Sequence, residues 1–221
     1  MQTFTTTGPI TAVLSVPAGR IQITAAGGAD ATVGIRPADP AKGRDVKLAG
    51  QITVEFGDGV LRIAGPAAHR VFGSSGAVEL TVGLPAGSRV EAKTASAQFT
   101  TAGPLGEVSL DSAQATVSLE AAATAHLVLA DGDVTVGHLG GDAEIRTVRG
   151  DIHLTEAAGG AVVLRTETGT ISVGAAAGVS ATLDAGTTVG RIHNALRNTG
   201  GTPGLRIRAT TTVGDITAQS L

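Results

Sequence analysis

The sequence of 221 residues contains no cysteine, no tryptophan and no tyrosine, and its only aromatic side chains are four phenylalanines. Without cysteine, a disulfide framework, a thiolate metal site and a cysteine nucleophile are all excluded. The core must therefore be filled by Val, Ile, Leu and Ala, which suits thin repeated layers better than a sandwich built on large rings. An apolar fraction of 42% excludes a disordered chain.

Charge and long apolar runs are also scarce. The 16 basic and 19 acidic residues give a net charge of −3, and no basic run or stacking aromatic pair is present, so nucleic acid is excluded as a partner. No stretch approaches the roughly 18 apolar residues of a membrane span. Residues 1–19 lack the basic and continuous apolar regions of a signal peptide. We therefore expect a cytoplasmic protein without a membrane span.

The second half of the chain repeats one phrase, because TVRGDIHL (147–154) returns as TETGTISV (166–173). Strands with alternating apolar residues lie on both sides of each glycine turn, so one face is expected to be buried and the other solvated. The glycine itself suits a turn that needs a positive φ. The turn segments are DGDVTV (131–136), RGDIHL (149–154), TGTISV (168–173), VGRIHN (189–194) and VGDITA (213–218), with degenerate versions at 96–101 and 112–117.

One such unit cannot bury its apolar face alone, whereas stacked units pair at about 4.8 Å and share a core. The pattern predicts an all-β, parallel β-solenoid (a β-helix), right-handed by the general preference of parallel crossovers. The predicted inward side chains are Leu127, Leu129, Val134, Val136, Ala143, Ile145, Ile152, Leu154, Val162, Leu164, Ile171, Val173, Ala181, Leu183, Ile192, Leu205, Ile207 and Ile216.

Residues 1–95 are less regular. Alternating strands are predicted at 11–16, 20–24, 31–36, 51–56, 60–64, 77–83 and 88–93, with polar loops at 37–45 and 65–76 and no helix. We interpret this region as wider coils or a small capping sheet, followed by regular coils over 96–221. Because no linker interrupts the chain, residues 1–221 are expected to form a single domain whose irregular ends stop edge-to-edge growth.

The repeats IRTVRGDIHL and LRTETGTISV, with the strand pair VPAGRIQI and LPAGSRVEA, carry a family resemblance. The sequence resembles a bacterial family of candidate adhesins of unknown function, built on a β-strand-repeat domain. The resemblance covers nearly the whole chain. It implies a β-solenoid, often in the bacterial envelope, and it supplies no catalytic motif.

When the turn segments are aligned, two equivalent positions, here called columns, contain mostly polar side chains. The first contains Thr135, His153, Ser172, His193 and Thr217, in which Ser172 is expected about 5 Å from each of two histidines if the coils stack in chain order. Such a pair can act as nucleophile and base, so His153, Ser172 and His193 are the catalytic candidates. The alternative, which we favour, is a solvated polar ladder, because no acid is placed to orient either histidine.

The second column follows the turn glycine and contains Asp133, Asp151, Thr170, Arg191 and Asp215. Asp133 and Asp151 are candidate metal ligands, since paired carboxylates bind Ca²⁺. The alternative, which we favour, is that the aspartates support the turn through local hydrogen bonds, so no metal and no cofactor is expected.

The third candidate is the loop HRVFGSSG (69–76), in which His69, Arg70 and Phe72 are candidate ligand-binding residues. Loops on a rigid scaffold often carry function, although a plain connection between strands is the simpler interpretation.

Two functions remain open. The first is a non-enzymatic β-solenoid scaffold for a protein partner or for self-assembly. The second is a cofactor-independent enzyme (an isomerase, a cyclase or a carbohydrate-active enzyme) or a small-molecule binder. It would use an apolar pocket in the N-terminal half, near Phe56, Phe72 or Phe99. We favour the first because no catalytic constellation is visible.

Overall fold

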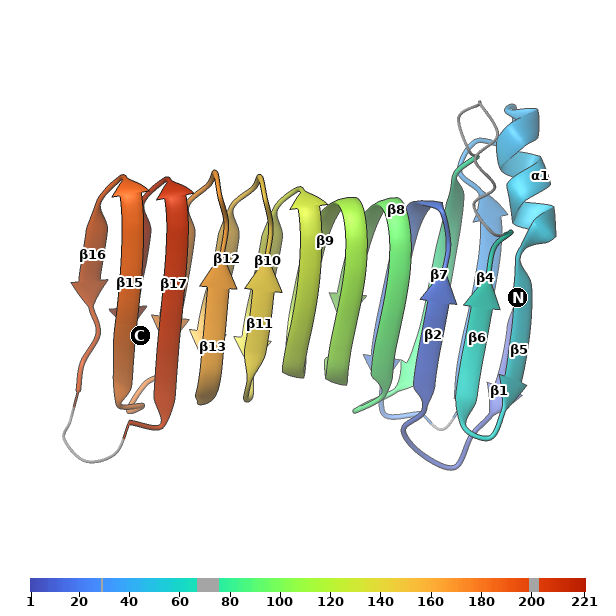
Figure 1. The fold of residues 1–221 in the computed structure, drawn as a ribbon. Coiled ribbons are helices and arrows are strands. Elements are labelled where there is room, and N and C mark those ends of the chain that lie inside the picture. Colours follow the sequence, from blue (N-terminus) through green and yellow to red (C-terminus); the bar gives the residue numbers. More distant parts are fainter. Residues whose placement is uncertain (29, 67–75, 199–202) are drawn as a thin grey trace. The chain divides into compact units, whose positions relative to one another are not determined.

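The computed structural model describes residues 1–28, 30–66, 76–198 and 203–221. The chain forms two compact units, 1–115 and 116–221, and strands dominate both (Figure 1). The first unit contains β1 (Gln2–Thr5), β2 (Thr11–Ser15), β3 (Ala18–Ala26), β4 (Asp30–Pro37), α1 (Gly43–Gln51), β5 (Thr53–Gly57), β6 (Val60–Ala64), β7 (Val78–Pro85) and β8 (Arg89–Ala102).

Strand β9 (Pro104–Asp131) contains the last residues of the first unit and the first residues of the second. The second unit continues with β10 (Val134–Leu139), β11 (Ala143–Arg146), β12 (Ile152–Ala157), β13 (Gly160–Arg165), β14 (Ile171–Ala175), β15 (Ala181–Val189), β16 (Ile192–Ala195), β17 (Leu205–Val213) and β18 (Ile216–Ser220).

The first unit combines parallel coils with antiparallel end strands. β2 pairs in parallel with β6 and β8, and β3 pairs in parallel with β7 and β8. β4 is antiparallel to β1 and β7, and β5 is antiparallel to β6. The rings of Phe4 in β1 and Phe56 in β5 lie 5.5 Å apart, centroid to centroid, while Phe99 is fully buried. The less regular region therefore ends in antiparallel strands bridged by aromatic rings.

A helix in the first unit contradicts the sequence-based expectation of none. α1 occupies the second part of the predicted loop 37–45 and the residues after it, and it contacts β4 and β7. Leu48 is its only buried apolar residue, and Val46 is exposed. An apolar stripe at helical spacing is the main signal for a helix, and α1 has almost none.

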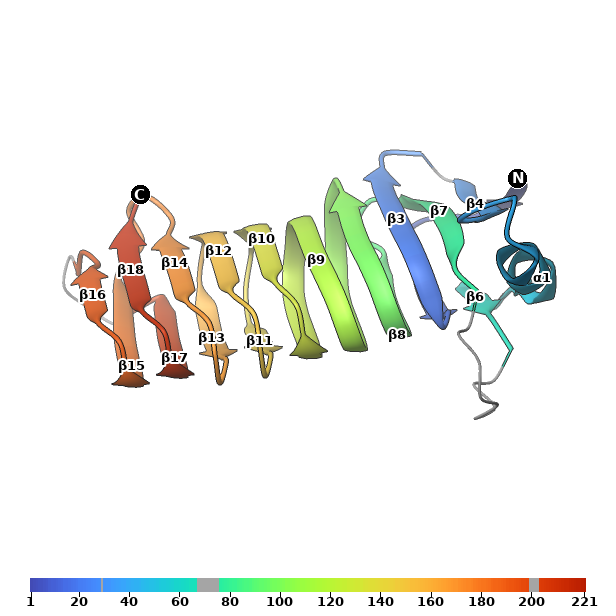
Figure 2. The same ribbon diagram turned by 90° about the horizontal axis from the view of Figure 1, so that it is seen from above.

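The second unit consists of two ladders of parallel strands, which Figure 2 shows as two layers. One ladder contains β10, β12, β14, β18 and β16, and the other contains β11, β13, β17 and β15. The last part of β9 pairs with β10 and β11. Inward side chains stack in register: Val134 beside Ile152, Ile152 beside Ile171, and Ile171 beside Ile216.

The predicted inward side chains are confirmed as buried with two exceptions. Leu183 is half-buried and Ile192 is 46% exposed, whereas its counterparts Ile171 and Ile216 are 1% and 0% exposed. Both exceptions lie on the coil formed by β15 and β16. Their exposure indicates that this coil is covered on one side only.

The coils do not stack in chain order. The last coil in the sequence, β17–β18, lies between the coil of β13–β14 and the coil of β15–β16. The coil of β15–β16 is thus the outermost coil on this side of the second unit. Its sequence suits that place, because Arg191 replaces the turn aspartate and Asn194 stands where the interior coils have Leu154, Val173 and Ala218.

Candidate functional site

The turn glycines of the second unit stack directly on one another. Gly169 has a φ of +151°, and a Cβ built on it would lie 2.1 Å from the carbonyl oxygen of Gly150. Gly150, with a φ of +138°, has the same relation to Gly132. Real Cβ atoms do not approach an oxygen so closely, and φ values in this range favour glycine. Glycine is therefore required both by the turn and by the close approach of the next coil.

A threonine three residues before the turn glycine ties each turn to its neighbour. The hydroxyl of Thr166 donates a hydrogen bond of 3.1 Å to the carbonyl oxygen of Gly150, and that of Thr211 donates one of 3.1 Å to Gly169. Thr187 does the same with Gly214 at 3.0 Å. Thr166 is 2% exposed, so its hydroxyl has to find a partner inside the protein. The repeated Thr-x-x-Gly pattern is thus a cross-coil hydrogen bond.

The aspartates after the turn glycines bind backbone amides of neighbouring coils. An Oδ1 atom of Asp133 accepts a hydrogen bond from the Asp151 N–H at 2.9 Å, and Asp151 accepts one from Thr170 at 2.7 Å. Asp215 accepts one from the backbone N–H of Arg191 at 2.8 Å. These carboxylates therefore hold the turn of a neighbouring coil, 18 to 24 residues away in the sequence, and not their own turn through the local hydrogen bonds of the favoured interpretation. Among the described residues, no group of three or more His, Cys, Asp or Glu side chains is placed to hold a metal ion.

The predicted polar ladder is present, but its neighbours differ in part from the expectation. His153 lies beside Thr135 on one side and Ser172 on the other. Ser172 lies beside Thr217, and His193 follows Thr217. The expected contact between Ser172 and His193 is wrong, because β18 is inserted between β14 and β16. His153 and His193 are exposed and Ser172 is half-buried.

Two histidine–carboxylate pairs lie outside the predicted columns. His126 Nδ1 is 3.4 Å from a carboxylate oxygen of Glu144, and His138 Nδ1 is 3.4 Å from one of Glu156. Each pair joins equivalent positions one coil apart, so the repeat period was the signal that could have found them. All four side chains are at least one third exposed. Such pairs in water contribute little to stability.

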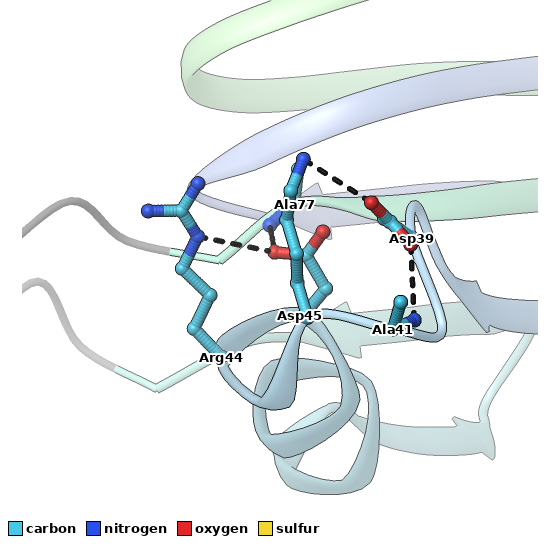
Figure 3. Close-up of polar contacts among 6 residues, drawn as sticks. Asp39, Ala41, Arg44, Asp45 and Ala77 are labelled. Atoms are coloured by element: carbon cyan, nitrogen blue, oxygen red, sulfur yellow. Dashed lines mark hydrogen bonds and ion pairs between the residues drawn. The ribbon is translucent and has the colours of Figure 1, made fainter.

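The loop candidates His69, Arg70 and Phe72 lie outside the described residues. The chain after this loop is anchored to α1, as Figure 3 shows. Asp45 is 4% exposed, accepts a hydrogen bond from the Ala77 N–H at 3.0 Å, and lies 3.7 Å from the Arg44 guanidinium. Upstream, Asp39 accepts a hydrogen bond from the Ala41 N–H at 2.9 Å and pairs with Lys42 at 3.2 Å.

These contacts have an electrostatic consequence at Asp39. The hydrogen bond from the Ala41 amide, followed by that from Lys42, holds the pKa of this carboxyl below its ordinary value of 3.8. The Asp39 carboxylate is exposed, so its contacts stabilise only the turn before α1.

An open groove of about 420 Å³ lies in the first unit, lined in part by Ser15, Pro17, Lys93, Thr94 and Asp111. The Lys93 ammonium and the Asp111 carboxylate, both in the lining, are 4.0 Å apart. Neither Phe56 nor Phe99 lines this groove, and Phe72 lies outside the described residues. The groove is therefore not the pocket predicted near the phenylalanines.

Fold and surface together define a class: a mostly β, solenoid-like repeat protein with largely parallel strands, whose recurring turn phrase makes hydrogen bonds between neighbouring coils. The chain belongs to the Toastrack DUF4097 family, whose sequence profile matches residues 13–220. No curated protein matches the sequence.

Several solved structures align with this chain at low sequence identity, and the first of them shares its fold. A candidate adhesin from Bacteroides fragilis aligns with a TM-score of 0.58 and 16% identity, over 100% of this chain and 95% of that chain. A candidate cell-adhesion protein from Clostridium sporogenes aligns with a TM-score of 0.42 and 12% identity, over 100% and 98% of the two chains. A candidate lipid-binding protein from Parabacteroides distasonis gives 0.48 and 12%, over 98% and 95%.

The one helix of the described residues, α1, is too short and too polar to cross a membrane.

Proposed function

We propose that this chain is a non-enzymatic β-solenoid scaffold, with a right-handed coil, that binds a protein partner or a second copy of itself. The observation that carries the proposal is that the polar side chains of the turns bind neighbouring coils and are not arranged around a ligand site. The threonines and aspartates of the turn phrase make hydrogen bonds to neighbouring coils. His153 and His193, in the outward column of the repeat, are exposed, so water there competes with any bound small molecule.

The binding face of this proposal is the ladder of β10, β12, β14, β18 and β16. Its outward column of Thr135, His153, Ser172, Thr217 and His193 contains no aspartate, glutamate, lysine or arginine. A flat face of small polar side chains matches the polar character of non-obligate protein interfaces. Adhesion is the role named for the Bacteroides fragilis protein of similar fold, and it agrees with such a face.

A second candidate function is small-molecule binding, with or without catalysis, in the groove of the first unit. The observation that favours it is the Lys93–Asp111 pair in the lining of a hollow of about 420 Å³. Fold alone supports neither candidate, because parallel β-solenoids host enzymes as well as scaffolds.

Native mass spectrometry on protein purified gently from the organism that encodes it distinguishes the two. A bound protein or a discrete oligomer without a small-molecule adduct supports the scaffold. A monomer that carries a reproducible small-molecule mass overturns it in favour of the groove.

A pair of matched variants then tests the face. Ser172 and Val163 are both half-buried, outward side chains of interior strands, one on each ladder. Ser172→Arg is expected to abolish the complex, while Val163→Arg leaves it intact. The reverse result, or equal loss in both, would show that the polar ladder is not the binding face.

A further inference from the structure

The outermost coil of the second unit has one side without a strand partner. Among the described residues, β15 pairs only with β17, and β16 pairs only with β18 (Figure 1). An unpaired strand presents a row of free N–H and C=O groups and is a template for another strand. The neighbouring interior coils have strands on both sides.

Both the backbone and the core layer are open there. The N–H of Leu205 in β17 donates to the carbonyl of Ser180, so Ser180 faces the paired side. Since successive residues of a strand face opposite sides, the backbone groups of Ala181, Leu183 and Ala185 face the free side. The end of the core is uncovered as well, because Leu183 is half-buried and Ile192 is 46% exposed.

We propose that a second copy of this chain covers this edge, with β15 pairing antiparallel to the β15 of its copy and Ala185 facing Ala185. This inference goes beyond the proposed binding face, because it places the second copy on the free edge of β15 and not on the outward column that contains Ser172. The strand runs from Ala181 to Val189, and the Val189 carbonyl already accepts a hydrogen bond from the Gly214 N–H of its own chain. A register centred on Ala185 therefore pairs the free backbone groups of Leu183, Ala185 and Thr187. In this register Leu183 faces Thr187, and the backbone N–H and C=O groups of both residues point toward the other copy.

Charge supports this register against its neighbour. A register shifted to centre on Asp184 would put two carboxylates directly opposite each other, which is unfavourable. Centred on Ala185, Asp184 faces Gly186, around which nothing lies within 4 Å of a Cβ position. Each Asp184 is also neutralised by Arg208 of its own chain, whose Nε lies 3.0 Å from the carboxylate.

The pairing closes on itself. A two-fold contact uses the same patch on both copies and leaves no further edge of this kind, so assembly stops at a dimer. In the first unit, the end strands β1 and β5 also have one strand partner each among the described residues, but they pair antiparallel to β4 and β6 and are not part of a parallel coil edge like that of β15.

Single cysteines test the register, because the chain has none of its own. Two Ala185 Cα atoms in a hydrogen-bonded antiparallel pair lie about 5.5 Å apart, which is within disulfide range. Ala185→Cys is therefore expected to give a disulfide-linked dimer under mild oxidation. The matched control is Val163→Cys, which is equally half-buried but lies on a strand paired on both sides, and it should stay uncrosslinked.

A proline variant tests the edge without cross-linking. Proline is tolerated on an edge strand where the N–H faces solvent, so Ala185→Pro should keep the far-ultraviolet circular dichroism of the fold and lose the dimer in sedimentation velocity. Crosslinking of Ala185→Cys no greater than that of Val163→Cys, or a folded Ala185→Pro that remains dimeric, would overturn the self-pairing.

The failure of this inference is distinguishable from that of the scaffold function. A wild-type chain that is monomeric at all concentrations but carries another protein in native mass spectrometry overturns the self-pairing and leaves the scaffold function standing. A monomer with only a small-molecule adduct overturns both.

Discussion

Replacing a single turn glycine should destabilise the second unit far more than its small change in size suggests. In Gly169→Ala, the new Cβ would meet the Gly150 carbonyl oxygen at 2.1 Å and a carboxylate oxygen of Asp151 at 3.1 Å. The oxygen at 2.1 Å belongs to the backbone and cannot rotate away. Relief requires the two coils to separate, which weakens the 2.9 Å hydrogen bond from the Gly150 N–H to the Thr168 carbonyl.

The expected loss follows from two separate costs. A non-glycine residue held at a sparsely populated φ costs about 1–3 kcal/mol. Forcing an extra methyl group into a packed site costs about 1–3 kcal/mol more. We therefore expect Gly169→Ala to lower the free energy of unfolding by about 4 kcal/mol, a large share of the roughly 5–15 kcal/mol of an ordinary domain.

Urea denaturation followed by far-ultraviolet circular dichroism measures this difference. Gly178→Ala is the matched control, because Gly178 also has a positive φ (+79°) but no atom lies within 4 Å of its Cβ position. The control carries only the backbone cost of about 1–2 kcal/mol. If Gly169→Ala loses no more stability than Gly178→Ala, the stacking of turn glycines does not restrict these positions and the reasoning is refuted.

Three further measurements test other contacts. Thr166→Val leaves the Gly150 carbonyl without its 3.1 Å hydrogen bond and should lower the free energy of unfolding by about 1–3 kcal/mol, while Thr166→Ser should recover most of it in the same urea assay. Asp45→Ala removes the buried acceptor of the Ala77 N–H and should cost about 1–3 kcal/mol in thermal unfolding; an unchanged melting temperature would contradict the anchoring role. Titration by NMR should give Asp39 a pKa below 3.8; because the folded-state pKa is depressed, its stabilisation is complete above 3.8 and is lost as the pH falls through the folded value, and an unshifted pKa would contradict the turn contacts.

The sequence predicted which side chains of the candidate site point outward, but it did not predict which of them are neighbours. Alternation placed His153 and Ser172 outward and side by side, as the register shows. The expected contact between Ser172 and His193 failed because it assumed coils stacked in chain order. The His126–Glu144 pair lies outside the turn segments and was not predicted, although the repeat period relates these two positions as well.

The sequence by itself determined the coil. Period-two alternation decides which side chains can be buried, and a glycine with a positive φ decides where the chain turns; both are local properties, so the inward residues and the turn positions follow from reading along the chain. Helix α1 could not be predicted in this way, because it is held by the buried Leu48 and by the Asp45–Ala77 hydrogen bond and has no apolar stripe.

Only the tertiary structure decided the order of the coils. All turn phrases offer nearly the same hydrogen bonds, so any coil can stack on any other, and the choice depends on which arrangement buries the most apolar surface. Placing the last coil inside gives Ile216 a fully buried position and leaves Arg191 and Asn194 on the outermost coil, where water solvates them. That choice, made by long-range packing, also creates the open edge at β15.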